Sequence, residues 1–324
     1  MRVFKQLVGL GATLFLLAGC ATSTPSNRDF SIALLGDTQY NSRDDLAFAN
    51  MFAALNKEQF AFVFHVGDFK AGSDSPCTDA LFTARLKQYQ QSSSPLVYIP
   101  GDNEFIDCQR KSNGAQGPLE RIAKLRTLFY PNNESLGHRR IKVARQSDAV
   151  DGAGTPPTRY SENMRWQREG IIFFTVNVQG SNDGVGFNVA MDAEQRERET
   201  ANIAWMQAAF ALARAENAVG VVMFAHANPG FEEPSAKVAA GAYPPFLRAF
   251  EATAQAWQKP VLFAHGDTHQ YRLAPYQSPI DRRPIANITR VETPGSPVTN
   301  WVRINVRPDH AAAPFEVMLG GMGF

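Results

Sequence analysis

The dipeptide Gly-Asp occurs four times in this chain, and each copy follows an apolar run with the features of a buried β-strand. The four copies are Gly36-Asp37, Gly67-Asp68, Gly101-Asp102 and Gly266-Asp267. A single Gly-Asp usually marks a turn, because both residue types tolerate turn conformations. Four copies at four strand ends instead indicate one shared site, since open α/β sheets bind ligands at the carboxyl ends of their strands. Clustered carboxylates at that edge predict a metal site.

The composition is that of an ordinary globular protein. With 324 residues, 44% of them hydrophobic and 19% charged, the chain can bury a sizeable core and is not expected to be disordered. The formal net charge of +1 leaves no electrostatic footprint for nucleic acid. We therefore expect no nucleic-acid binding.

The first nineteen residues have the organisation of an export signal. Arg2 and Lys5 precede an apolar stretch, Leu7–Ala18, which is too short to span a bilayer. The following Gly19-Cys20 completes a segment that resembles the cleavage box of bacterial lipoproteins. This resemblance implies that residues 1–19 are a signal peptide.

In lipoproteins the new N-terminal cysteine, here Cys20, is lipidated, and residues 20–29 would then be a flexible tether. Ala21 follows the cysteine, whereas an Asp there would mark retention at the inner membrane. We expect a lipid-anchored protein of the bacterial cell envelope, at the outer membrane and facing the periplasm. An ordinary secretory signal with an incidental cysteine is the alternative.

Two further cysteines, Cys77 and Cys108, remain once Cys20 is set aside. Each follows one of the Gly-Asp pairs by a similar distance, so both are expected on loops above the site. An oxidising compartment would join them, and we predict a Cys77–Cys108 disulfide. Two unrelated free thiols are the alternative.

Strand-like and helix-like segments alternate along most of the chain, from residue 30 onwards. Apolar runs predict strands at 32–35, 60–66, 95–100, 170–178, 219–224 and 260–264, and helical spacing predicts helices at 44–58, 79–91, 118–130, 192–215 and 245–257. This alternation predicts βαβ units, an α/β fold and a largely parallel sheet, within one domain spanning residues 30–324.

Two regions depart from the alternation. Residues 131–169 lack periodicity and are expected to be a long surface excursion, whose basic cluster at 139–145 is either a solvated face or a wall for an anionic substrate. After residue 270 the chain has short strand-like runs at 287–292, 300–306 and 315–318 and no long helix, which suggests a second, more antiparallel sheet.

Two of the six histidines, His226 and His269, close predicted strands beside the carboxylates. A single histidine at a strand end is usually a hydrogen-bonded structural residue, but beside four Gly-Asp carboxylates both are better interpreted as metal ligands. His65 and His265 precede their Gly-Asp pairs and are expected to face the flanks of their strands.

The order and spacing of these residues resemble the calcineurin-like metallophosphoesterases, whose motifs are D-x-H, G-D, G-N-H-D/E, a lone H and G-H-x-H. The resemblance covers about Phe30 to Gln270 and implies a four-layer α/β/β/α sandwich with two divalent metal ions at the strand ends. Asp37 matches the first Asp of the family and Asp68 the bridging Asp. His226 matches the lone His and His269 the last His.

Four positions depart from the family pattern. Gln39 and Asp267 replace metal-binding histidines, Asp102 replaces the metal-binding Asn, and Asn103 replaces the catalytic His. All four keep polar side chains, and three keep an oxygen that can bind a metal. We interpret the motifs as a variant site.

The resemblance also implies which residues bind each metal. The first metal would be held by Asp37, Gln39, Asp68 and His269, and the second by Asp68, Asp102, His226 and Asp267. Few imidazoles and many oxygens favour Mn²⁺, Mg²⁺, Ca²⁺ or Fe over Zn²⁺.

The predicted function is a metal-dependent phosphoester hydrolase that uses metal-activated water on a small-molecule or anionic phosphoester. Asp68, as the bridging ligand, and Asn103 are the candidate catalytic residues, but Asn103 cannot protonate a leaving group. A non-catalytic, metal-binding envelope lipoprotein that binds an anionic ligand is the alternative. The sequence leaves the choice between them open.

Overall fold

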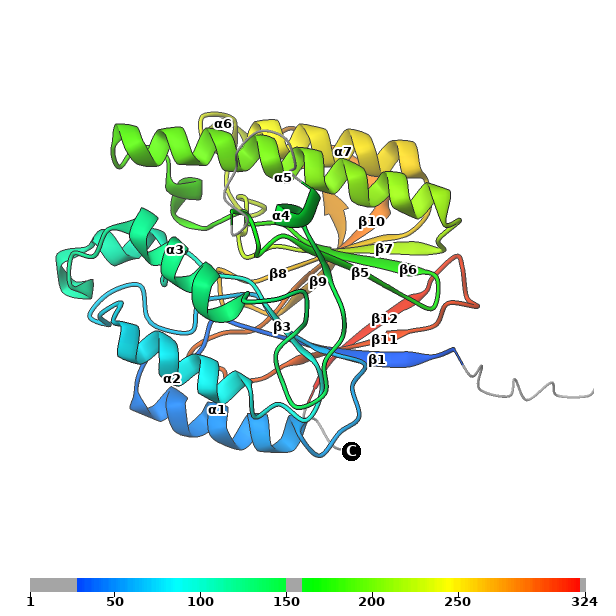
Figure 1. Cartoon of the computed structure of the whole chain (residues 1–324). Coiled ribbons are helices and arrows are strands. Elements are labelled where there is room, and N and C mark those ends of the chain that lie inside the picture. The colour runs from blue at the N-terminus through cyan, green and yellow to red at the C-terminus, as the bar shows by residue number, and fades with distance from the viewer. Residues whose placement is uncertain (1–27, 150–158, 321–324) are drawn as a thin grey trace, which may run out of the picture.

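A computed structural model describes residues 28–149 and 159–320, so residues 1–19, Cys20 and the tether up to residue 27 lie outside the described residues. Figure 1 shows two β-sheets packed face to face, with helices on both outer faces. This arrangement confirms the expected four-layer α/β/β/α sandwich. Among the described residues, no helix is long and apolar enough to cross a membrane.

The first sheet has five strands in the order β12-β11-β1-β2-β3. Its strands are β1 (Phe30–Leu35), β2 (Val63–His65), β3 (Leu96–Tyr98), β11 (Val302–Val306) and β12 (Phe315–Leu319). The first three are parallel to one another, whereas β11 pairs antiparallel with both β1 and β12. The helices of the layer beside this sheet are α1 (Ser42–Leu55), α2 (Asp79–Tyr89) and α3 (Pro118–Phe129).

The second sheet has seven strands in the order β4-β5-β6-β7-β8-β10-β9. A parallel centre consists of β6 (Ile171–Thr175), β7 (Gly220–Phe224), β8 (Val261–His265) and β10 (Pro284–Glu292). Antiparallel strands flank it: β4 (Ala144–Arg145), β5 (Met164–Arg168) and β9 (Arg272–Gln277). Above this sheet lie the long helices α5 (Val189–Ala215) and α7 (Pro244–Trp257), with the short helices α4 (Gln146–Ala149) and α6 (Ser235–Ala239).

The central strands are apolar on both faces because both faces are covered. In β6, Phe173 belongs to the core between the sheets, whereas its neighbours Ile172 and Phe174 belong to the core shared with α5 and α7. Aromatic rings dominate the core between the sheets: Phe64 stacks on Phe224 with ring centres 3.8 Å apart. Such continuous apolar runs are typical of strands buried on both sides.

Side-chain caps fix where the helices begin. Asn41, Thr78 and Asn188 precede α1, α2 and α5, and each accepts a hydrogen bond from a backbone N–H of the first turn. Such caps satisfy donors that would otherwise lack partners, and they are typically worth about 1 kcal/mol each. α3 begins instead with Pro118, whose fixed φ suits the first helical position.

The C-terminal strands do not together form the second, more antiparallel sheet that the sequence suggested, because they are divided between the two sheets. β10 extends the second sheet in parallel with β8, and β9 closes its edge. β11 and β12 instead join the first sheet beside β1. Strand partners are set by long-range packing, which local sequence periodicity does not report, and the result is two mixed sheets.

The described parts of the predicted surface excursion, residues 131–149 and 159–169, contain β4 and β5. Their basic residues contact backbone far from the predicted site. Arg139 donates to the carbonyl oxygens of Phe60 and Ser93, which precede β2 and β3. The basic cluster therefore helps to hold this segment at the amino ends of the strands, away from the carboxyl ends.

Candidate metal centre at the strand ends

The four Gly-Asp carboxylates all follow the carboxyl ends of strands, as predicted. Asp37 follows β1, Asp68 follows β2, Asp102 follows β3 and Asp267 follows β8. His226 comes directly after β7. Because the two sheets face each other, loops from both sheets meet at one end of the sandwich.

The backbone at this site adopts conformations that non-glycine residues seldom use. Five predicted ligands have positive φ angles: Asp37 (52°), Gln39 (74°), Asp68 (58°), Asp267 (86°) and His269 (64°). Each such residue costs of order 1 kcal/mol, and clusters of them are typical of functional sites. The surrounding packing holds these side chains in place against that cost.

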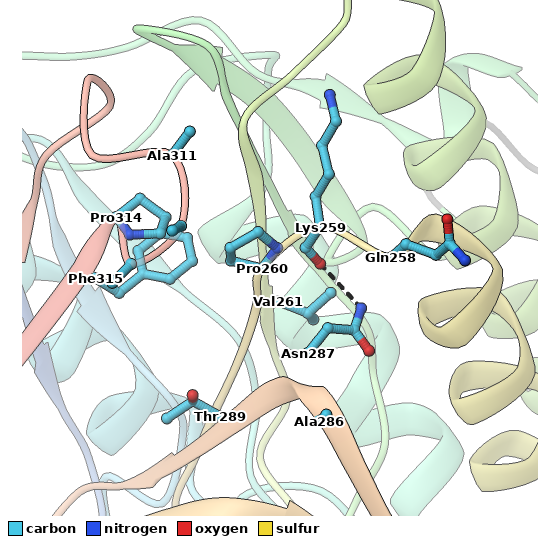
Figure 2. Close-up of a pocket in the computed structure, with 12 residues that line it drawn as sticks. Gln258, Lys259, Pro260, Val261, Ala286, Asn287, Thr289, Ala311, Pro314 and Phe315 are labelled. Atoms are coloured by element: carbon cyan, nitrogen blue, oxygen red, sulfur yellow. Dashed lines mark hydrogen bonds between the residues drawn. The ribbon is translucent and has the colours of Figure 1, made fainter.

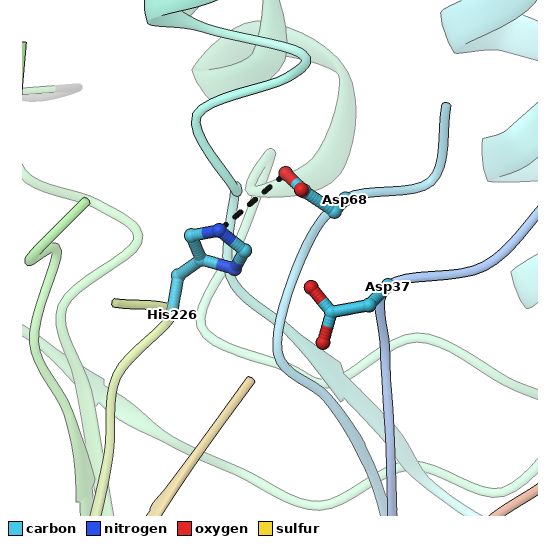
Figure 3. A group of neighbouring side chains, drawn as sticks. All are labelled: Asp37, Asp68 and His226. Carbon is cyan, nitrogen blue, oxygen red and sulfur yellow. Dashed lines mark ion pairs between the residues drawn. The ribbon is translucent and has the colours of Figure 1, made fainter. Parts of the chain in front are cut away.

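Asp37, Asp68 and His226 form one group whose potential ligand atoms lie within 4.8 Å of one another (Figure 3). Asp102, His226 and Asp267 form a second such group. His226 belongs to both, with its Nε2 2.9 Å from an Asp102 oxygen and 3.5 Å from an Asp68 oxygen. Its Nδ1 lies 2.8 Å from the Val66 carbonyl, which orients Nε2 toward the carboxylates.

Glycines leave the space that these carboxylates occupy. A Cβ at Gly101 would collide with the carboxylate of Asp68, and a Cβ at Gly266 with that of Asp37. At Gly180 it would lie 2.6 Å from an Asp102 oxygen and 2.8 Å from an Asp267 oxygen. A larger residue at any of these three glycines would therefore displace a carboxylate of one of the two metal-ligand groups.

The electrostatics of the cluster fit bound cations. Burial raises the pKa values of Asp37 and Asp68 well above the ordinary range, because each carboxylate loses its hydration. Burial alone would lower the pKa of His226, but the charges of Asp68 and Asp102 outweigh it and raise that pKa. Asp37 Oδ2 is buried and has no hydrogen-bond partner among the described residues. Divalent cations would supply the missing positive charge and the missing partner.

Two predicted ligands make other contacts. Gln39 donates its amide to Asp45 on α1 at 3.1 Å, while its amide oxygen is buried without a hydrogen-bond partner in the described part of the chain. His269 is held through Nδ1 by the Ser296 carbonyl at 2.9 Å, and its Nε2 lies 3.1 Å from the Tyr40 hydroxyl. Metal binding by these two residues stays a prediction.

A family model for calcineurin-like phosphoesterases matches residues 30–271. The chain belongs to this family. The comparison with curated proteins found no match. One solved structure that the chain resembles is titled "GAP50 the anchor in the inner membrane complex of Plasmodium", with 9% sequence identity, a TM-score of 0.47, and coverage of 90% of this chain and 88% of that chain.

In this calcineurin-like phosphoesterase, Asn103 is the residue that the motif resemblance matches to the family's catalytic histidine, and its side chain makes two hydrogen bonds. Its amide nitrogen donates to the Lys70 carbonyl at 3.0 Å and contacts the Tyr40 hydroxyl at 3.2 Å. Its backbone N–H donates to Asp68 Oδ1 at 3.0 Å. Asn103 therefore positions its neighbours, and an amide carries no proton that it could give to a leaving group.

Sequence reasoning missed several residues that position the site. Glu104 accepts hydrogen bonds from Tyr98, Gly101 and the backbone of Asp68. Ser181 donates to Asp102 Oδ2 at 2.6 Å. The acidic residue of the family's G-N-H-D/E motif was a signal for Glu104, whereas nothing local marks Ser181.

The predicted Cys77–Cys108 disulfide is confirmed, with the two Cα atoms 5.6 Å apart. Its sulfur atoms lie 3.6 and 3.8 Å from the carbonyl oxygen of Asn103, which also accepts a hydrogen bond from Lys70 Nζ at 2.8 Å. The disulfide thus supports the loop that carries Asp102 and Asn103. His65 and His265 contact Tyr89 and Arg290 and not the cluster, as their place before the Gly-Asp pairs indicated.

A cavity of about 360 Å³ adjoins the second metal-ligand group, with Asp267 and Ser181 in its wall. Tyr243, Val238 and Asn228 form other parts of that wall. Figure 2 shows a different cavity of about 530 Å³, lined by residues such as Pro260 and Phe315. Pro260 precedes β8, so this second cavity lies at the amino ends of the strands, and no acidic residue or histidine lines it.

Proposed function

We propose that the protein is an exported, metal-dependent phosphoester hydrolase that acts on a small-molecule phosphoester. The observation that carries this proposal is the pair of potential metal-ligand groups that share His226 at the carboxyl ends of β1, β2, β3, β7 and β8. All of their residues are buried except Asp267, which is half-buried. Family membership supports the reaction class, and the partnerless oxygen of Asp37 supports metal binding.

Asp37 and Asp68 would hold one metal ion, Asp102 and Asp267 the other, and His226 lies between them. In this family of sites, bound metal ions activate water and stabilise charge on phosphoryl oxygens. Carboxylate oxygens dominate the donor set, which favours Mn²⁺, Mg²⁺, Ca²⁺ or Fe over Zn²⁺. Four carboxylates also balance the charge of two divalent ions.

The cavity beside Asp267 supports a proposal about the alcohol part of the substrate. Its lining contains one cation, Lys237, which pairs with Glu233 at 2.9 Å. A second phosphate would therefore find no uncompensated positive charge there. Val238 and the ring of Tyr243 instead suit an uncharged organic group, and about 360 Å³ is within the size range of small-molecule sites.

Elemental analysis of the purified protein, combined with a panel of phosphate mono- and diesters, tests the proposal. We expect about two divalent ions per chain and turnover of at least one ester class. Asp68→Asn should lower both the metal content and the turnover, because its carboxylate is neutralised. Asp281→Asn, at an exposed position in the turn between β9 and β10, is the matched control and should lower neither.

A metal-loaded protein that hydrolyses no phosphoester would contradict the enzyme proposal. The non-catalytic metal-binding protein that takes up an anionic ligand would then be favoured, because Asn103 lacks an acidic proton. Equal metal content in Asp68→Asn and the wild type would contradict the metal site itself.

We also propose that Cys20 anchors the protein in the outer membrane, facing the periplasm. The lipoprotein-like leader supports this localisation. β1 begins at Phe30, near the tether, and Asp37 follows its opposite end. A domain held through Cys20 would therefore carry its metal centre on the end away from the anchor, where water-soluble substrates have access.

A further inference from the structure

We propose that Tyr40 donates a hydrogen bond to the leaving-group oxygen of the substrate, and that Asn103 positions Tyr40 for this role. The role presupposes the hydrolase activity proposed above and deepens it. Asn103 cannot protonate a leaving group, and in this proposal Tyr40 stabilises the leaving group instead.

The Tyr40 hydroxyl lies among three polar groups of the site. It is 3.2 Å from the amide nitrogen of Asn103, 3.0 Å from Asp68 Oδ2 and 3.1 Å from His269 Nε2. The Asn103 amide nitrogen can only donate, so the Tyr40 oxygen is the acceptor in that contact. Tyr40 in turn donates its one hydroxyl proton to Asp68 Oδ2. The proton therefore lies at the metal centre already, and it would turn from Asp68 to the leaving oxygen of a bound substrate.

Access distinguishes the two residues. The Asn103 side chain is 7% exposed, and its amide is shared between Lys70 and Tyr40. Tyr40 is partly exposed as a residue, but its hydroxyl is enclosed by Asn103, Asp68 and His269. A substrate at the metal centre would therefore contact this hydroxyl by displacing one of these partners. The Tyr40 ring packs edge-on against His269, with ring centres 5.1 Å apart, and this contact limits its movement.

The expected contribution depends on the leaving group. As the P–O bond breaks, its electron pair moves onto the leaving oxygen, which takes up a proton from solvent after water has supplied the new oxygen on phosphorus. A hydrogen bond from Tyr40, which keeps its own proton, stabilises the charge on that oxygen during the step. An alkoxide gains more from this donor than an activated aryl oxide, whose charge is already delocalised.

The test compares Tyr40→Phe with the wild type in the full chain loaded with Mn²⁺. For an alkyl phosphate such as methyl phosphate we expect kcat/KM to fall about a hundredfold, the usual effect of removing one such donor. For 4-nitrophenyl phosphate it should change by less than about threefold. The Tyr40 hydroxyl contacts two predicted metal ligands, so both proteins are compared at saturating Mn²⁺ and their manganese contents are measured in parallel. Asn103→Ala should show the same preference for activated esters with a smaller loss.

Tyr271→Phe is the matched control, because it removes a hydroxyl from a tyrosine that packs on the core outside the metal centre. It should leave both esters unaffected. If the loss of activity in Tyr40→Phe disappears once manganese is raised to saturation, Tyr40 acts only by supporting Asp68 and His269 as metal ligands, and the inference is overturned. Equal losses for both esters, or no loss, would overturn it while leaving the hydrolase proposal intact. If the loaded wild type hydrolyses neither these esters nor any in the wider panel, both proposals fail.

Discussion

The Cys77–Cys108 disulfide allows a quantitative test of how the site is supported. The two cysteines are 31 residues apart in sequence and join the loop after β2 to the loop after β3. In the chain-entropy account, a cross-link over 31 residues stabilises the folded state by about 3.7 kcal/mol at 25 °C. The double variant Cys77→Ala/Cys108→Ala should therefore lose about that free energy of unfolding, with a further small loss from buried sulfur.

The same substitution should also weaken metal binding. The disulfide and Lys70 both contact the carbonyl oxygen of Asn103, and Asp102 is the preceding residue. Without the cross-link, the loop that places Asp102 is held mainly by hydrogen bonds. Groups that support metal ligands in this way typically change metal affinity by about tenfold to a hundredfold.

Urea unfolding of the metal-free proteins measures the difference in free energy of unfolding between wild type and double variant, without the contribution of bound metal. Wild type treated with reductant should move toward the double variant, which controls for packing changes caused by alanine. Manganese titration of the folded proteins then measures the second effect. A stability difference below about 1 kcal/mol would refute the entropic estimate, and unchanged manganese affinity would refute the structural link to Asp102.

Three further predictions concern separate parts of the chain. Burial, and to a lesser extent the charge of Arg85, lower the pKa of His65 in the folded protein to about 3. In the unfolded chain this pKa is about 6.5, so as the pH falls below that value the unfolded state takes up a proton and the folded state does not. His65 should thus cost roughly 2 kcal/mol of stability between pH 7 and pH 5, and His65→Gln should flatten this dependence in urea unfolding, with the exposed His310→Gln as control. Gly180→Ala should lower manganese affinity about tenfold by displacing Asp102 and Asp267, whereas Gly117→Ala, where a Cβ has space, should not, as titration would show. Cys20→Ser should release the protein from membranes in fractionation, and a soluble wild type would contradict the anchor.

The sequence was sufficient to place the four carboxylates at strand ends, because an apolar run followed by Gly-Asp is a local signal. It was not sufficient for the antiparallel strands that flank the centre of the second sheet. β5 carries Arg165, Gln167 and Arg168, and β9 contains Pro275, which is tolerated only where a strand needs no full set of partners. Such segments form strands because they pair with a neighbouring strand, and their own composition does not predict it.

Sheet membership of the C-terminal strands also lay beyond local reasoning. β11 pairs with β1, so Val302 lies opposite Leu34, although most of the chain separates them. Both strands are short, and β11 alternates apolar residues with Arg303 and Asn305. This alternation does not distinguish pairing with β1 from pairing with β10. Which sheet β11 joins is determined by the packing of complete layers. No single segment of the sequence contains that information.

The site itself shows why motif positions alone do not assign roles. Asn103 was a catalytic candidate by its place in the motif, but the structure commits its amide to Lys70 and Tyr40. Tyr40 is three residues after Asp37 and has no counterpart in the motifs, yet its hydroxyl lies beside Asp68 and His269. Four carboxylates would bring two bound divalent ions close to neutrality, so a phosphate dianion would be attracted less strongly by net charge. Discrimination between substrates would then depend more on neutral contacts, such as the Tyr40 hydroxyl and the cavity beside Asp267.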